Sequence, residues 1–243
     1  MKEFKSRVRQ FYRFDNEELK HFIIAVLVCA FIFGFNDKQE VFELGHWIVN
    51  FIGAIIISGV AIFLHISAQK LWGIKVGYEA RFKMSPYLLL IGLIVSVLSG
   101  GRWYFLAPGT IMLTHITSLR LGAFRHGYNY TLAGYVALAG PIMSVLAGMF
   151  VKVIWQIFNF TTPFLEQFIF FNFLLAFFSM LPLPGLSGLQ VFFGSRMWFA
   201  LGVGCVFGYL ILFYMNMYSL FGALFIGGVI WLLYYVTFER KAW

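Results

Sequence analysis

The chain has 243 residues, of which 61% are apolar and 12% are charged, and its mean hydropathy is +0.83. Soluble domains carry about 25% charged residues, so this composition excludes an ordinary soluble domain and indicates an integral membrane protein with several spans. The net charge of +8 is typical of basic helix ends lying against anionic headgroups, and we expect no nucleic-acid partner.

The first twenty residues form a leader that is basic and then acidic, with aromatic residues interleaved. This pattern predicts an interfacial helix lying on the bilayer, followed by a second helix capped by Asp15 or Asn16. The first apolar run begins near Phe22 with no small-residue cleavage site behind it, so we expect it to be retained as a helix. Both cysteines, Cys29 and Cys205, lie in apolar stretches and indicate no disulfide framework.

Apolar runs of spanning character recur along the rest of the chain. The six predicted spans are Phe22–Phe35, Leu44–Leu71, Thr131–Phe158, Phe164–Leu181, Trp198–Met215 and Leu220–Phe238. A seventh apolar run, Tyr87–Ser99, has only 13 residues and predicts a re-entrant element. The mixed segment after it contains a β-prone stretch, Thr110–Thr117, and a loop with Lys75, Arg81 and Lys83 precedes it.

The distribution of basic residues orients these spans. The basic leader, the Lys75–Lys83 loop and the C-terminal Arg240-Lys241 predict a multi-pass protein of the cell membrane with both termini in the cytoplasm. We therefore expect an all-α polytopic fold with a small β-containing insertion. We treat it as a single membrane domain, residues 1–243, divided into a leader (1–20), a core (44–188) and a C-terminal helical hairpin (198–238).

The most informative motif is His65-Ile66-Ser67-Ala68-Gln69 in the second span. A membrane zinc protease carries H-E-x-x-H on such a helix. Its two histidines, four residues apart, lie on one helix face and bind zinc, and the Glu polarises the bound water. Here His65 occupies the first histidine position, Ile66 the Glu position and Gln69 the second histidine position.

Three blocks occur in a characteristic order: Phe63–Gly73, Ala139-Gly140-Pro141, and Asn172 followed by Leu181–Gly188. They resemble the metal-binding helix, the Ala-Gly-Pro helix start, and the Asn with its L-P-x-P-x-L-D-G block in the site-2 protease family of intramembrane zinc proteases. The likeness is closest to the archaeal branch and extends from about Phe14 to Phe193. It implies a site-2-protease-like core.

In that family two His and one Asp bind zinc, and one Glu is the general base. The resemblance places His65 and Gln69 at the two histidine ligands, Ser187 at the Asp ligand and Ile66 at the base. Asn172 lies where the family's Asn helps to hold the substrate or the transition state. The same resemblance assigns four residues to a substrate groove, which are Asn172, Pro182, Pro184 and Gly188.

Of the four positions for the zinc ligands and the base, all except His65 have lost the property that the chemistry needs. Ile66 has no proton to exchange, Gln69 is a neutral and weak oxygen donor, and Ser187 is no carboxylate. Because a catalytic zinc usually needs three protein ligands, we expect no catalytic residue and no cofactor, with His65 left as a remnant ligand. Zinc would return only in a site rebuilt around His65, for which His115 and His126 are the candidates.

The resulting hypothesis is a non-catalytic membrane protein that binds transmembrane segments of clients, or regulates a membrane partner, without cleavage. A second hypothesis is an active intramembrane protease, with a rebuilt zinc site or with a Ser187–His65 dyad, since Gly185-Leu186-Ser187-Gly188 matches the G-x-S-G pattern of rhomboid-type proteases. A third is a small-molecule channel, transporter or lipid-handling protein, although no acid in a predicted span marks an ion path.

Overall fold

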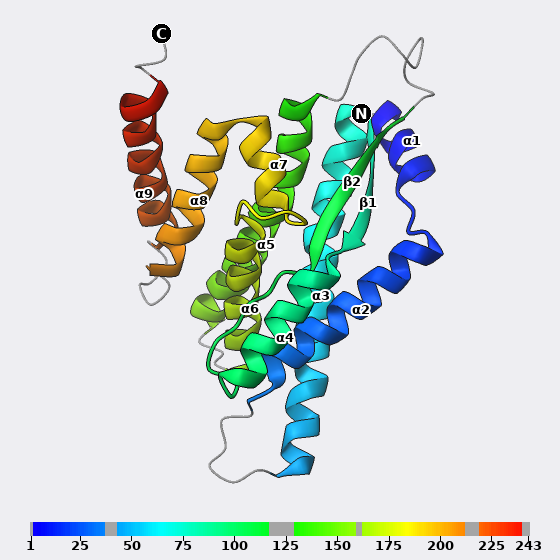
Figure 1. The fold of residues 1–243 in the computed structure, drawn as a ribbon, viewed down its shortest axis with the longest axis vertical. Coiled ribbons are helices and arrows are strands. Elements are labelled where there is room, and N and C mark those ends of the chain that lie inside the picture. Colours follow the sequence, from blue (N-terminus) through cyan, green and yellow to red (C-terminus); the bar gives the residue numbers. More distant parts are fainter. Residues whose placement is uncertain (1, 37–42, 117–128, 159–161, 212–218, 240–243) are drawn as a thin grey trace.

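The structure is a computed structural model that describes residues 2–36, 43–116, 129–158, 162–211 and 219–239. It is mostly helical, with one small sheet (Figure 1). The elements in chain order are α1 (Lys2–Phe11), α2 (Asn16–Gly34), α3 (Leu44–Val76), β1 (Tyr78–Met84), α4 (Pro86–Leu98), β2 (Gly109–His115), α5 (Tyr130–Phe158), α6 (Pro163–Ser179), α7 (Ser187–Gly194), α8 (Arg196–Ile211), α9 (Ser219–Tyr234) and a π-helical turn (Tyr235–Glu239).

The two longest helices, α3 and α5, form the centre of the molecule. They contain 33 and 29 residues and are long and apolar enough to cross a membrane. They pack along one another, and α6 packs against α5. Among the described residues these two helices alone meet the length and composition expected of a span. The six-span topology therefore stays a prediction.

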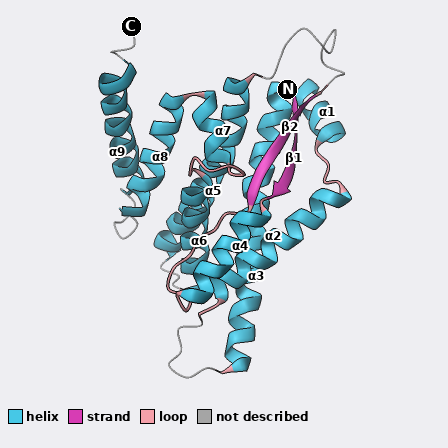
Figure 2. Ribbon diagram, in the orientation of Figure 1, coloured by secondary structure: helices cyan, strands magenta, loops and turns pink. Residues whose placement is uncertain are grey.

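The prediction of a loop around Arg81 and Lys83 is wrong, because this segment is strand β1. Its side chains alternate, with Tyr78, Ala80 and Phe82 buried and the charged residues between them more exposed. This period of two fits a half-buried strand. β1 pairs antiparallel with β2 from Tyr78↔His115 to Met84↔Gly109. The β-prone stretch predicted near Thr110 is confirmed as β2 (Figure 2).

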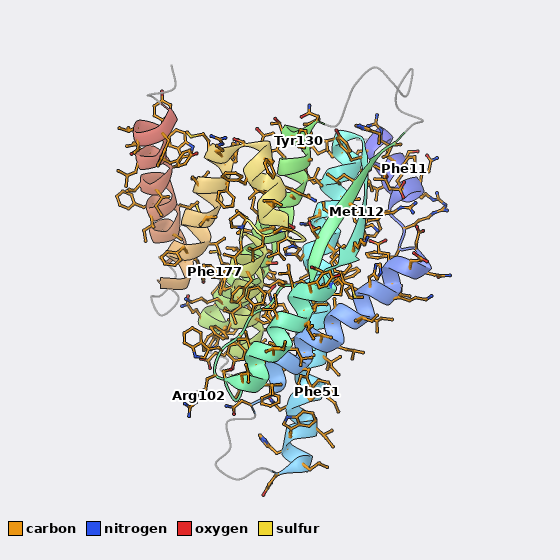
Figure 3. All side chains as sticks on the ribbon, viewed as in Figure 1. Phe11, Phe51, Arg102, Met112, Tyr130 and Phe177 are labelled. Carbon is orange, nitrogen blue, oxygen red and sulfur yellow. The ribbon has the colours of Figure 1, made fainter. Side chains whose placement is uncertain are left out.

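Helix α4 covers the short apolar run that was predicted to be re-entrant. It begins at Pro86, directly after β1, and β2 follows it after an extended return. Because Tyr78 pairs with His115, the chain enters and leaves the unit formed by β1, α4 and β2 at the same end. In Figure 3, Arg102 marks the far end of the excursion and Tyr130 the end to which the chain returns.

The helix start predicted at Asp15 or Asn16 is confirmed. Only α1 is a separate helix, and α2 begins at Asn16 with Asp15 as its N-cap residue. Consequently Glu18, assigned to the polar leader from the sequence, is 4% exposed and lies inside the protein. Its carboxylate pairs with the Lys70 ammonium at 2.6–2.7 Å and accepts the Phe82 backbone N–H at 2.8 Å. A buried carboxylate is tolerable because both its oxygens are bonded.

The C-terminal half contains one helix that the sequence analysis missed and one hairpin that it predicted. Helix α7 follows the Pro-Gly turn directly at Ser187. Helices α8 and α9 pack as the predicted hairpin, and small residues bring them close together. A Cβ on Gly204 would lie 3.0 Å from the Cα of Gly227, and one on Gly208 would lie 3.0 Å from Ile226, in keeping with helix packing through glycines.

Candidate functional site

The structure brings together three of the predicted site residues in one buried cluster. His65 and Gln69 project from adjacent turns of α3, and Ser187 is the first residue of α7. Their exposures are 4%, 1% and 0%. We call these residues, together with Ser144 of α5, the polar cluster. All of its members are enclosed, so none faces an open cleft.

Small residues on α5 let the cluster form. Gly140 lies directly opposite the side chains of His65 and Gln69, and any Cβ at this position would overlap both. One turn further on, Ser144 is fully buried, and its Oγ lies 2.9 Å from Nδ1 of His65. The four-residue spacing places both small residues on one face of the helix. The close approach of α3 and α5 is therefore built around this site.

Hydrogen bonds fix the orientation of the Gln69 amide. Its nitrogen donates to the carbonyl oxygen of Ala137 at 3.0 Å and to the hydroxyl oxygen of Ser187 at 3.0 Å. A carbonyl oxygen only accepts, so the flipped amide would set two acceptors against each other. The same nitrogen lies 3.4 Å from Nε2 of His65.

This arrangement assigns the tautomer of His65. Its Nε2 faces an amide nitrogen, which donates and does not accept, so Nε2 carries the lone pair. The proton is then on Nδ1, which donates to Ser144 Oγ. Both ring nitrogens of the histidine thus face neutral side chains: Nδ1 donates to Ser144, and Nε2 lies against the Gln69 amide, whose two hydrogens go to Ala137 and Ser187. The imidazole is positioned by the protein itself, without a charged partner.

Ile66 has an apolar environment. It is 1% exposed and belongs to the main core cluster, with Ile62, Phe171 and Leu175. A carboxylate at this position would have to sit in that core or push into the neighbouring polar cluster. The side chain contributes to packing and offers no proton for acid–base chemistry.

The donors present do not fit a catalytic zinc. They are one imidazole nitrogen, one amide and one hydroxyl, whereas zinc sites use Cys, His and carboxylate ligands. In the described part of the chain no group of three His, Cys, Asp or Glu side chains could hold a metal ion. Of the two histidines considered for a rebuilt site, His115 has its ring against Tyr78, with centroids 4.6 Å apart. His126 lies outside the described residues.

The residues predicted to line a substrate groove are divided between inside and outside. Pro182 and Pro184 are exposed in the turn before α7, whereas Gly188 is buried. Asn172 on α6 is also fully buried; its amide nitrogen donates to the carbonyl of Phe168 at 2.9 Å, and its Oδ1 has no hydrogen-bond partner among the described residues. These four residues do not border one open surface.

An apolar groove instead follows the outer side of α3 and α5. It consists of two hollows of about 810 and 640 Å³ that meet at Leu64, Met143 and Leu146. The first reaches Lys75 on α3 and Tyr135 on α5, and the second reaches Val153 and Phe168. The residues of α3 and α5 in this wall directly neighbour those of the polar cluster. We call it the α3–α5 groove.

Ser144 and the Ala137 carbonyl are the site components that sequence reasoning missed. Gly140, Ser144 and Gly148 form a stripe of small residues at four-residue spacing along α5, and the pattern alone is typical of ordinary helix packing. That interpretation holds for Gly148, which faces Phe173 and Asn172. The available signal was a hydroxyl within the stripe one turn after Ala139-Gly140-Pro141. A buried hydroxyl needs a partner, and here the partner is His65.

Comparison with known proteins gives one informative relative. A protein of Methanocaldococcus jannaschii named "Putative zinc metalloprotease MJ0611" is 26% identical over 183 residues, which cover 74% of this chain and 85% of the relative. No protein-family model matches the chain, and no solved structure matches it. The match confirms the resemblance predicted from the sequence blocks only at this level: the chain is a distant homologue of the protein that carries this name.

Proposed function

We propose that this chain is a multi-pass membrane protein with a site-2-protease-like fold that binds transmembrane segments of clients, or of a membrane partner, without cleaving them. The homologue named as a zinc metalloprotease supports the protease lineage. The apolar helices α3 and α5, each long enough to span a membrane, support the membrane location.

The observation that carries the loss of cleavage is the amide of Gln69. It occupies the second ligand position of the inherited motif and is hydrogen-bonded to Ser187, at the third. In the family these two positions supply zinc ligands. Here the side chains of Gln69 and Ser187 are hydrogen-bonded to each other instead. Ile66 is packed in the core, so among the described residues no carboxylate stands in the polar cluster where the family's Glu would activate water.

The α3–α5 groove supports the binding of a transmembrane segment. On α5 it runs from Tyr135 to Val153, and eighteen residues of helix rise about 27 Å. The hydrocarbon core of a bilayer is about 30 Å thick, so the groove follows nearly its whole depth. Its lining is almost entirely apolar, as a lipid-embedded helix requires. A client helix in this groove would contact α3 and α5, the two helices that carry His65, Gln69 and Ser144 of the polar cluster.

The arrangement of the elements favours the proposed topology. The unit from Tyr78 to His115 begins and ends at one place, as a re-entrant segment without a net crossing would. Helix α1 and the end of α9 lie at the same end of the molecule (Figure 1). This agrees with six crossings and with both termini in the cytoplasm, as the basic residues predict.

The geometry does not favour a Ser187–His65 dyad. Such a dyad needs the hydroxyl within hydrogen-bond reach of the imidazole, whereas Ser187 Oγ accepts a bond from Gln69 and His65 Nδ1 is engaged by Ser144. Labelling with a fluorophosphonate probe separates the alternatives. We expect no labelling, and labelling at Ser187 that His65→Ala abolishes would establish the dyad.

Photocrosslinking in vesicles tests the proposed binding. A photoreactive residue is placed at Ala147, in the α3–α5 groove, and in a matched protein at Phe225, which is exposed on α9. A synthetic transmembrane peptide of about 20 apolar residues is the probe. We expect adducts at position 147 well above position 225, with the peptide intact. Equal labelling, or peptide fragments that a zinc chelator suppresses, would refute the proposal.

A further inference from the structure

One end of the α3–α5 groove differs from the rest of it. At this end the Lys75 ammonium lies 4.3 Å from the centre of the Trp72 ring, and Tyr135 and Trp198 complete the rim. Trp and Tyr concentrate at the depth of lipid headgroups, and Lys extends its charge into that layer. Lys75 is exposed, and among the described residues it is the one charged residue that lines this hollow. The described residues that line the opposite hollow are all apolar.

The hollow that begins at this rim has the depth of a single leaflet. On α3 it runs from Lys75 to Leu64, and on α5 from Tyr135 to Leu146. Eleven residues of helix rise about 16 Å, and one leaflet contributes about half of the roughly 30 Å hydrocarbon core. Both walls are therefore about as long as one acyl chain, and the Lys75 ammonium lies at the end where the headgroup would be.

Helix α1 adds positive charge beside the same rim. Phe4 lines the hollow, and the side chains of Lys5 and Arg9 on the same helix are exposed. The leader is held to α3 by a 2.8 Å hydrogen bond between Tyr12 and Ser67. That bond engages the hydroxyl of Ser67, a polar side chain on the wall. The described lining is therefore an apolar slot under a cationic rim, and no acid is among the described residues that line it.

We propose that this hollow is a binding site for one anionic phospholipid, with an acyl chain between α3 and α5 and the phosphate-bearing headgroup at Lys75. Charge complementarity selects the anionic class, because a zwitterionic headgroup brings its own cation to the rim. The leaflet-deep walls match the length of one acyl chain beneath that headgroup. The site stands independently of client binding, and its lipid would have to leave before a client helix filled the groove.

The test compares lipid binding by the intact protein in detergent, using native mass spectrometry with phosphatidylglycerol or phosphatidylcholine added at equal concentration. A lysine near a membrane surface contributes about 1 kcal/mol toward anionic lipid. We therefore expect Lys75→Gln to weaken phosphatidylglycerol binding roughly five-fold relative to phosphatidylcholine. Lys83→Gln, which removes an exposed lysine of β1 away from the groove, is the matched control and should leave the preference unchanged.

A second variant tests the slot without altering charge. Ala68→Phe fills the wall of the hollow and should reduce binding of both lipids while Lys75 is intact. Equal binding of the two lipids by the unmodified protein, or equal losses in Lys75→Gln and Lys83→Gln, would overturn the proposal. Failure of the peptide crosslinking experiment would leave these results unaffected, so the two proposals fail separately.

Discussion

The side-chain nitrogen of Gln69 lies 3.0 Å from the hydroxyl oxygen of Ser187, although 118 residues separate them along the chain. The family resemblance assigns both positions to zinc ligands. In this protein they bond each other directly, and the same nitrogen also bonds the Ala137 carbonyl. A buried network in which the polar groups have partners stabilises one arrangement of its helices. These hydrogen bonds therefore tie α3, α5 and α7 together.

Replacing Gln69 should destabilise the protein. Gln69→Leu keeps a similar volume but leaves the buried Ala137 carbonyl and the Ser187 hydroxyl without their donor. The free energy of unfolding should fall by about 1–3 kcal/mol, measured by reversible unfolding in mixed micelles. The control is Asn36→Leu, which removes an exposed amide bonded to the Gly100 carbonyl and should change stability by less than about 1 kcal/mol. Equal losses would contradict the assigned network.

The sequence predicted the helices well because apolar runs of spanning length leave few alternatives. The predicted Leu44–Leu71 and Thr131–Phe158 spans correspond closely to α3 and α5. Strand β1 was missed because Arg81 and Lys83 were counted as loop charges, although they alternate with buried residues. Helix α7 was missed because Pro and Gly directly before it signal a turn.

The candidate site was predicted in part. The motif spacing placed His65 and Gln69 on one face of a helix, and the family block linked them to Ser187. Neither the motif nor the family block could show which groups the Gln69 amide would bond, because that depends on which backbone carbonyl faces it in the folded protein. The Ala137 carbonyl and the Ser144 hydroxyl come from a helix that is distant in sequence. The burial of Glu18 was also unpredictable, because its partner Lys70 lies 52 residues away.

Gly140 should tolerate no side chain. Gly140→Ala would drive a methyl group into His65 and Gln69, and such overpacking typically costs about 1–3 kcal/mol. Gly228→Ala is the matched helical control, because a Cβ there meets nothing within 4 Å. It should be neutral, or stabilising by up to about 1 kcal/mol. If melting in micelles shows the two variants to be equally stable, α3 and α5 are further apart at this point than described.

The buried Glu18–Lys70 pair should be sensitive to loss of one partner. Both side chains are 3% exposed, so Glu18→Leu leaves an uncompensated ammonium inside the protein and should cost about 3–5 kcal/mol. The double variant Glu18→Leu with Lys70→Met should recover much of that loss. Asp15→Asn breaks the exposed pair with Arg81 and should cost less than about 1 kcal/mol. A double variant no more stable than Glu18→Leu would contradict this account.

Restoring the missing groups should restore metal binding. The variant Gln69→His with Ser187→Asp would place a second histidine and a carboxylate beside His65, at positions that the structure brings together. Three such ligands are the usual set for a catalytic zinc. We expect about one zinc per chain, lost when His65→Ala is added. A variant that folds, as judged by its melting transition, but binds no zinc would show that the backbone no longer supports the site.

The central claim is that this protein retains the protease scaffold without its metal chemistry. The most direct measurement is the zinc content of the purified, detergent-solubilised protein by elemental mass spectrometry, beside a His65→Ala variant. Since one histidine with an amide and a hydroxyl does not make a zinc site, we predict less than about a tenth of a zinc per chain, unchanged by the substitution. Close to one zinc per chain, lost with His65, would contradict the account.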